Sequence, residues 1–235
     1  MVSVFNKIKH VCSWVLLCLL VVTNVVFASE EADVNQDAVA SQIDAVKKLQ
    51  VLLTSLDSVQ ASFRQTTLDS HGNFLQEVVG SMKAKKPGFF YWNTLPPMEQ
   101  LLVTNGDRLW LYDPDLEQVT VKALDKRLSA TPALILNGNV DDIGSEYHIT
   151  AASINADSWR FMLQPKDPES LFEGLRLTFE RGVLVEMFLE DGLGQKTSIL
   201  FHDIDQATLL DDSIFTFQPP EGVDIISDYS SDVNG

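Results

Sequence analysis

Cysteine is almost absent from the sequence. Its two copies, Cys12 and Cys18, both lie within residues 1–28, and neither follows the small residues that lipoprotein processing requires. The remainder of the chain can therefore form no disulfide and carry no lipid anchor of its own. A domain without such cross-links must be stabilised by its own hydrophobic core.

Basic residues are also scarce. The 17 lysines and arginines face 33 aspartates and glutamates, which leaves a formal net charge of -16. Nucleic acids and anionic membrane surfaces are poor partners for such a chain, because both attract basic faces. We interpret the charge as a means of solubility. A dedicated acidic docking surface is the alternative.

Patterns that would indicate catalysis or metal binding are missing. His71, His148 and His202 have no metal-ligand spacing around them, and the chain contains neither HExxH nor G-x-S-x-G. The glycines of segment 192–197 lack the spacing of a phosphate-binding loop. The sequence therefore predicts a protein that is not an enzyme and has no metal or cofactor.

A long apolar run, Val11 to Phe27, stands near the start of the chain. Lys7 and Lys9 precede it, and Val26-Phe27-Ala28 ends it in the manner of a signal-peptide cleavage site. The run is short for a membrane span. We expect residues 1–28 to be a cleaved signal peptide and residues 29–235 to form one exported domain.

The first periodic segment after this predicts a helix. Residues 29–38 are polar and acidic and should be frayed, whereas the apolar residues that follow have the spacing of one helical face. They are Val39, Ile43, Val46, Leu49, Leu53 and Leu56.

Most of the remaining chain alternates apolar and polar residues with a period of two, which is typical of half-buried strands. The densest aromatic stretch, Lys86 to Lys122, is divided by Pro96-Pro97, Asn105-Gly106 and Asp113-Pro114 into four short strands. We expect nine to eleven strands in a mainly β fold with few helices. The hairpin order favours a strongly curved antiparallel sheet or an open barrel, and the ordered part should end at Val223.

Segment 131–138 interrupts the β pattern. Thr131 and Pro132 have the residue types of a helix start, Gly138 could end the helix, and the residues between are almost all apolar. Such a helix must lie on an apolar surface and could serve as a lid. The patterns leave two alternatives open: a filled core, or a cavity for an apolar ligand.

Six motifs, in this order, make the chain resemble the periplasmic outer-membrane lipoprotein carriers of the LolA type. They are Ser62 to Gln65 (SFRQ), Lys86 to Trp92 (KPGFFYW), Leu102 to Gly106 (LVTNG), Leu109 to Pro114 (LWLYDP), Thr131-Pro132 and Phe215 to Val223 (FTFQPPEGV).

The resemblance implies an unclosed antiparallel β-barrel, covered by the N-terminal helix and a short helical lid, around a hydrophobic cavity. It implies a monomeric periplasmic chaperone that binds the acyl chains of triacylated lipoproteins. An inner-membrane ABC transporter would release these lipoproteins to it, and an outer-membrane lipoprotein receptor would accept them. No cofactor and no nucleic acid would take part.

The resemblance also assigns residues. Phe63, Phe90, Trp92, Leu102, Trp110 and Tyr112 would line the hydrophobic cavity. Pro132, Ala133, Leu134, Ile135 and Leu136 would form the lid. Lys86 stands where the family usually has an arginine that holds the lid by hydrogen bonds, and lysine lacks the planar donor fork of arginine. Lys86 is thus expected to be a weaker latch.

Three other functions remain as alternatives. An outer-membrane receptor of the same fold would itself be lipid-anchored, and this sequence lacks the lipidated-cysteine context. A secreted lipid-active hydrolase would need a nucleophile constellation, for which no pattern is present. A secreted β-rich interaction domain would have a filled core and would take up no hydrophobic probe.

Overall fold

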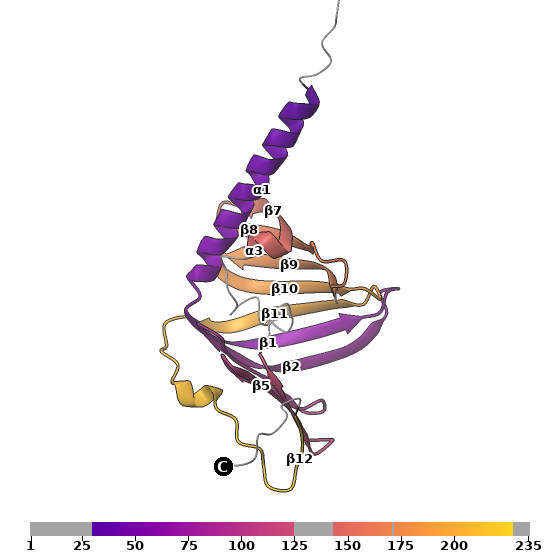
Figure 1. Cartoon of the computed structure of the whole chain (residues 1–235), viewed down its shortest axis with the longest axis vertical. Coiled ribbons are helices and arrows are strands. Elements are labelled where there is room, and N and C mark those ends of the chain that lie inside the picture. Colours follow the sequence, from indigo (N-terminus) through magenta and orange to yellow (C-terminus); the bar gives the residue numbers. More distant parts are fainter. Residues whose placement is uncertain (1–29, 125–142, 171, 228–235) are drawn as a thin grey trace, which may run out of the picture.

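The computed structural model describes residues 30–124, 143–170 and 172–227. It begins with a long helix, α1 (Glu30–Thr54), which starts earlier than the sequence predicted, because residues 30–38 continue the helix instead of fraying. Ala45, Leu49 and Leu53 are buried on one face of α1. The helix lies over one end of the sheet, and its N-terminal part projects beyond the sheet (Figure 1).

In the described part of the chain, twelve strands and two short helical segments follow. The strands are β1 (Ser58–Leu68), β2 (Phe74–Lys85), β3 (Phe89–Thr94), β4 (Gln100–Asn105), β5 (Arg108–Asp113), β6 (Gln118–Ala123), β7 (Tyr147–Asn155), β8 (Ser158–Pro165), β9 (Phe172–Glu180), β10 (Val183–Asp191), β11 (Lys196–Asp205) and β12 (Asp224–Ser227). The helical segments are α3 (Ile143–Glu146) and η3 (Asp212–Phe215).

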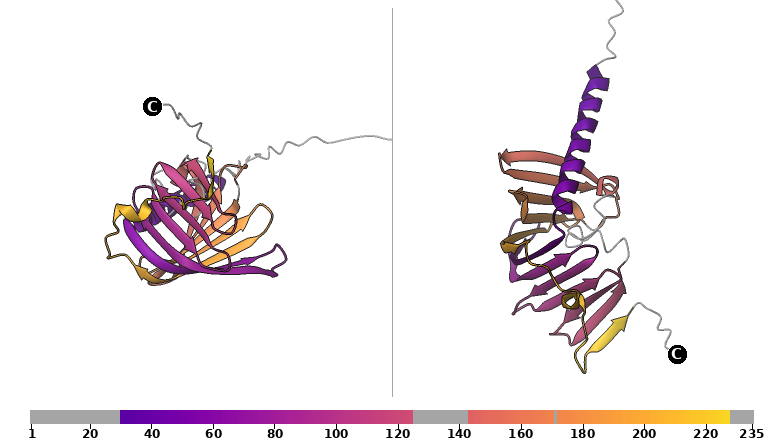
Figure 2. Two further views of the ribbon diagram at one scale, coloured as in Figure 1. Left: turned by 90° about the horizontal axis from the view of Figure 1, so that it is seen from below. Right: turned by 90° about the vertical axis from the view of Figure 1, so that its left-hand side faces the viewer.

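All twelve strands form one open sheet. Their order is β12-β6-β5-β4-β3-β2-β1-β11-β10-β9-β8-β7, so β7 and β12 are its two edges. Every pairing is antiparallel except that of β12 with β6, which is parallel. The sheet curves into a trough (Figure 2), which confirms the predicted unclosed, mainly β architecture.

The sequence did not predict two of these strands. β7 was missed because Ala151, Ala152 and Ser153 replace the large apolar residues that mark a buried strand. β12 was missed because it lies beyond Val223, where we expected the ordered part to end. Its residues are all exposed, so no apolar alternation marks it. Asp224 begins this strand by donating its N–H to the Glu117 carbonyl at 2.8 Å.

The two faces of the sheet are covered by different parts of the chain. We call the face under α1 the inner face, and it holds the main core. The largest fully buried side chains of that core are Leu49, Leu53, Phe63, Phe90, Ile149, Phe161, Leu163, Leu175, Leu177 and Phe179. Since α1 contributes two of them, the predicted covering of the sheet by the N-terminal helix is confirmed.

The opposite, outer face of β3–β5 is covered by the C-terminal segment 206–217. Phe215 is fully buried there beside Val103 and Leu210. The Lys85 ammonium donates to the Leu210 carbonyl at 3.0 Å and also pairs with Asp212. This part of the sheet is therefore apolar on both faces.

Gly80 of β2 allows two aromatic rings to pack closely on the inner face. It lies opposite Phe63 of β1. A Cβ atom at Gly80 would lie 2.1 Å from the Asn93 carbonyl oxygen and 2.5 Å from the Phe63 ring. Trp92 in turn stacks on Phe63, with ring centroids 3.7 Å apart. The missing side chain therefore leaves the space that the Phe63 ring occupies.

We predict that Gly80→Ala lowers the free energy of unfolding by about 1–3 kcal/mol or more. The new Cβ atom would collide with the Asn93 backbone and the Phe63 ring, and neither group can move aside without breaking strand pairing or ring stacking. Urea unfolding followed by circular dichroism measures the change. The matched control is Gly174→Ala in β9, where a Cβ meets nothing within 4 Å, and it should change stability by less than about 0.5 kcal/mol. Equal effects of the two changes would contradict this account of Gly80.

Candidate ligand-binding site

The inner face of β1–β4 brings four of the predicted cavity residues together. Trp92 pairs with Leu102 across β3 and β4. Its ring stacks on Phe63, lies 6.0 Å from the Phe90 ring and meets the edge of Phe201 at 6.4 Å. Phe63 and Phe90 are fully buried, whereas Trp92 and Leu102 are only partly buried. Phe63 and Phe90 therefore serve as the packed wall, and Trp92 and Leu102 face open space.

That open space is a pocket of about 430 Å³, which we call the inner pocket. This volume falls in the range of small-molecule binding sites. Its floor is apolar and consists of Val78, Trp92, Leu102 and Leu111. The rest of the lining is mainly polar, with Gln65, Gln76, Thr94, Glu99, Gln100, Asp113 and Asp115, and also includes the apolar residues Met98 and Leu116. The pocket can thus hold an apolar chain while a polar group stays at its rim.

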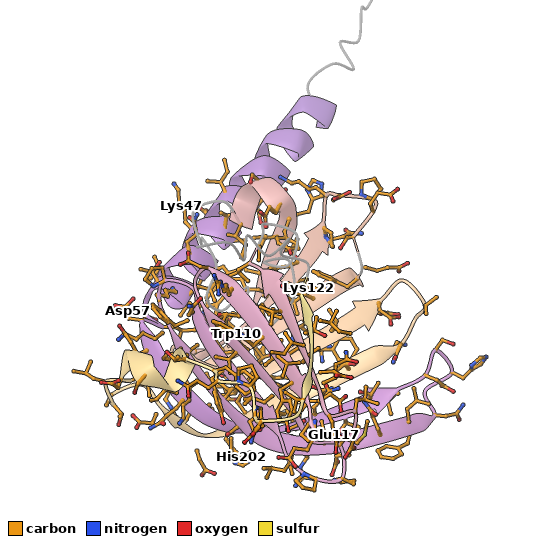
Figure 3. All side chains as sticks on the ribbon, turned by 60° about the horizontal axis from the view of Figure 1, so that its bottom comes forward. Lys47, Asp57, Trp110, Glu117, Lys122 and His202 are labelled. Atoms are coloured by element: carbon orange, nitrogen blue, oxygen red, sulfur yellow. The ribbon has the colours of Figure 1, made fainter. Side chains whose placement is uncertain are left out.

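The other two predicted cavity residues, Trp110 and Tyr112, lie on the outer face, and their placement in the cavity was wrong. Trp110 of β5 (Figure 3) packs with the outer core around Val103. The Tyr112 ring lies 5.6 Å from that of Phe217 in the C-terminal segment. Both are therefore separated from Phe90 and Trp92 by the sheet itself.

The reason lies in the strand register. Paired residues of neighbouring strands point to the same face of the sheet. Thr94 pairs with Gln100, so an even-numbered residue of β3 always pairs with an even-numbered residue of β4, and these residues share the inner face. Thr104 pairs with Leu109, so even-numbered residues of β4 pair with odd-numbered residues of β5, and the odd-numbered residues of β5 lie on the inner face. Leu111 therefore lies in the inner pocket. Sequence reasoning missed it, although the parity of the Asn105-Gly106 connection was a usable signal.

Lys86, in the β2–β3 turn, lies next to the C-terminal end of α1. Its ammonium donates a hydrogen bond to the carbonyl of Leu53, in the last turn of a helix that has no basic residue there. Its own N–H donates to the Asp57 carbonyl at 2.9 Å. Burial lowers the pKa of the Lys86 ammonium, and the nearby charge of Asp57 partly opposes that shift. Lys86 therefore caps α1 and ties it to the β2–β3 turn.

The predicted lid, Pro132 to Leu136, lies outside the described residues, so the latch role of Lys86 stays a prediction.

Across residues 30–124, 143–170 and 172–227 no three histidine, cysteine or acidic side chains gather in a way that could hold a metal ion. His71, His148 and His202 are all exposed. None of the helices in these ranges has the length and apolarity needed to span a membrane.

Comparison with known proteins points to one family. Residues 54–218 match the family model of "Outer membrane lipoprotein carrier protein LolA". Proteins named outer-membrane lipoprotein carrier protein from Pseudomonas paraeruginosa and Azotobacter vinelandii are each 46% identical over 184 residues, which is 78% of this chain and 88% of theirs. A solved LolA superfamily protein from Nitrosomonas europaea aligns over 72% of this chain and 97% of its own, at 16% identity and a TM-score of 0.43.

The adjacent residues Leu111 and Tyr112 provide a test of the pocket, because both are half-buried but on opposite faces. We predict that Leu111→Gln weakens binding of the neutral apolar probe N-phenyl-1-naphthylamine about tenfold, through loss of apolar contact. Tyr112→Gln should leave binding unchanged. Fluorescence titration measures both, and an equal loss in the two variants would place the probe outside the inner pocket.

Proposed function

Because the chain belongs to the LolA family of outer-membrane lipoprotein carrier proteins, we propose that it carries lipoproteins through the periplasm by enclosing their acyl chains. The observation that carries this proposal is the inner pocket, with Trp92 and Leu102 in its apolar floor. Binding needs no chemical step, so the protein acts as a chaperone and not as an enzyme.

The physical need for such a carrier follows from the hydrophobic effect. Moving one methylene group of an acyl chain from a membrane into water costs about 0.8 kcal/mol of free energy. A triacylated anchor therefore cannot cross an aqueous compartment unprotected. The open sheet supports this role, because an apolar inner face that is only partly covered by α1 can receive chains and also release them.

Two partners complete the proposed route: an inner-membrane ABC transporter that releases lipoproteins and an outer-membrane receptor that accepts them. Residues 1–28 are a signal peptide that is removed, and residues 29–235 act as one monomeric domain.

The distribution of exposed apolar residues supports transfer at the end of the sheet that holds the pocket rim. Leu193 in the β10–β11 turn is 87% exposed, and Leu116 in the β5–β6 turn is 67% exposed. Phe74, Leu75, Leu95 and Met98 lie at the same end and are also exposed. The β1–β2 and β10–β11 hairpins project together there, on the right of Figure 1. In the described structure, the β2–β3, β4–β5, β7–β8 and β9–β10 turns, at the other end, hold no exposed large apolar residue. The exposed apolar residues at that end are Ile154, near the end of β7, and Leu209 of the C-terminal segment, which is 92% exposed.

We further propose that Pro132 to Leu136 close over the inner pocket and that Lys86 helps to hold them. Lys86 already donates to a backbone carbonyl at the end of α1, next to the inner face. An ammonium has three donors, so it can bond a second carbonyl without leaving Leu53. A lid held by one such hydrogen bond would open more readily than one held by an arginine fork.

Cargo loading tests the proposed function. Membrane vesicles containing the transporter, ATP and a labelled lipoprotein should yield a soluble complex of one carrier with one lipoprotein. Trp92→Ser should reduce the yield at least tenfold, because it removes the largest side chain of the pocket floor. The neighbouring Tyr91, which packs on the outer face, provides the control: Tyr91→Ser should load normally. A wild-type carrier that leaves the lipoprotein in the membrane would refute the proposal.

The latch is tested through ligand release. Lys86→Leu should speed release of a bound neutral amphiphile several-fold, because the closed lid loses a hydrogen bond of about 1 kcal/mol. Stopped-flow fluorescence measures the rate. Lys85→Leu is the matched control, since the Lys85 ammonium is engaged with the C-terminal segment on the outer face. Unchanged release by Lys86→Leu would restrict Lys86 to capping α1.

A further inference from the structure

The rim of the inner pocket carries charge of one sign. Glu99, Asp113 and Asp115 are among its lining residues, and within the described structure no lysine or arginine lines it. Glu99 and Asp115 are exposed. The carboxylate of Asp113 accepts hydrogen bonds from the Gln100 side chain and the Leu116 N–H, both at 3.1 Å. The site is the pocket with its apolar floor, and these three carboxylates stand where the head group of a bound chain would lie.

Among the described residues, no lysine or arginine lines the inner pocket, and the ion pairs of Arg64, Lys85 and Arg176 involve other carboxylates. Arg64, which is next to the pocket residue Gln65, points to the outer face and pairs with Glu77. The ion pairs Lys85–Asp212 and Arg176–Glu186 do not involve Glu99, Asp113 or Asp115 either. An anionic head group entering the pocket would therefore be repelled by these three carboxylates, with no positive charge among the described lining residues to offset the repulsion.

We infer that the inner pocket selects acyl chains by their head group, accepting neutral ones and repelling anionic ones. This inference rests on the proposed function and adds which acyl-chain ligands the pocket binds. The amino terminus of a triacylated lipoprotein is blocked as an amide, so its anchor is uncharged. Fatty acids and anionic phospholipids carry equally apolar chains but a negative head group. Glu99, Asp113 and Asp115 thereby keep the carrier from filling with such lipids.

The effect should be moderate and should depend on salt. Exposed charges interact through water, so three nearby carboxylates are expected to weaken binding of an anionic amphiphile roughly tenfold relative to a neutral one. Because exposed charges are screened beyond about 10 Å at 0.1 M salt, the difference should shrink as the ionic strength rises.

The experiment compares probes with the same hexadecanoyl chain. Monopalmitoylglycerol is neutral and hexadecanoate is anionic, and each displaces N-phenyl-1-naphthylamine from the protein purified from the periplasm. Below their self-association limits and at low salt, the neutral probe should bind roughly tenfold more tightly. In the variant Glu99→Gln/Asp113→Asn/Asp115→Asn the two affinities should agree within about twofold.

A matched control separates the local effect from the overall charge of the protein. Asp107→Asn/Asp157→Asn/Glu180→Gln makes the same change in net charge, but these exposed residues lie at the other end of the sheet. This control should keep the full preference. A wild-type protein without preference, or a control that loses it as the rim variant does, would overturn the inference alone. Failure of both amphiphiles to bind would instead refute the proposed function, and this inference with it.

Discussion

The alternation of side chains across the strands is the constraint on which the rest of the structure depends. Because neighbouring residues of a strand point to opposite faces, one register decides which aromatic residues meet. Trp92 stacks on Phe63 over the gap left by Gly80 on the inner face, while Tyr91 packs on the outer face. Each face then needs its own cover, and the chain supplies α1 for one and its C-terminal segment for the other.

Two adjacent lysines at the end of β2 join these covers to the sheet. Lys85 binds the Leu210 carbonyl of the C-terminal segment, and Lys86 binds the Leu53 carbonyl of α1. Both of these acceptors are backbone carbonyls, and Lys85 pairs in addition with the Asp212 carboxylate. The start of β1 adds a third tie, since the Ser58 hydroxyl donates to the Thr208 carbonyl at 3.1 Å. The two covers therefore meet at one end of the sheet, away from the rim of the inner pocket.

A carrier of acyl chains must combine an apolar interior with a surface that stays soluble. The open sheet separates these demands by place: the floor of the inner pocket is apolar, its rim is acidic, and the chain as a whole has a net charge of -16. The same negative charge that keeps the protein soluble acts at the rim on whatever enters. Solubility and selectivity can thus share one physical cause.

The sequence by itself determined the mainly β architecture, the helix over Leu49 and Leu53, and the aromatic pair Phe90 and Trp92, because hydrophobic periodicity is a local signal. It missed β7 and β12, where small or exposed residues carry no alternation. Only the tertiary structure decided that Trp110 and Tyr112 face away from the pocket and that Leu111 faces into it. That choice depends on the pairing of Thr104 with Leu109, a contact between strands, and a shift of one residue there would have exchanged the two faces.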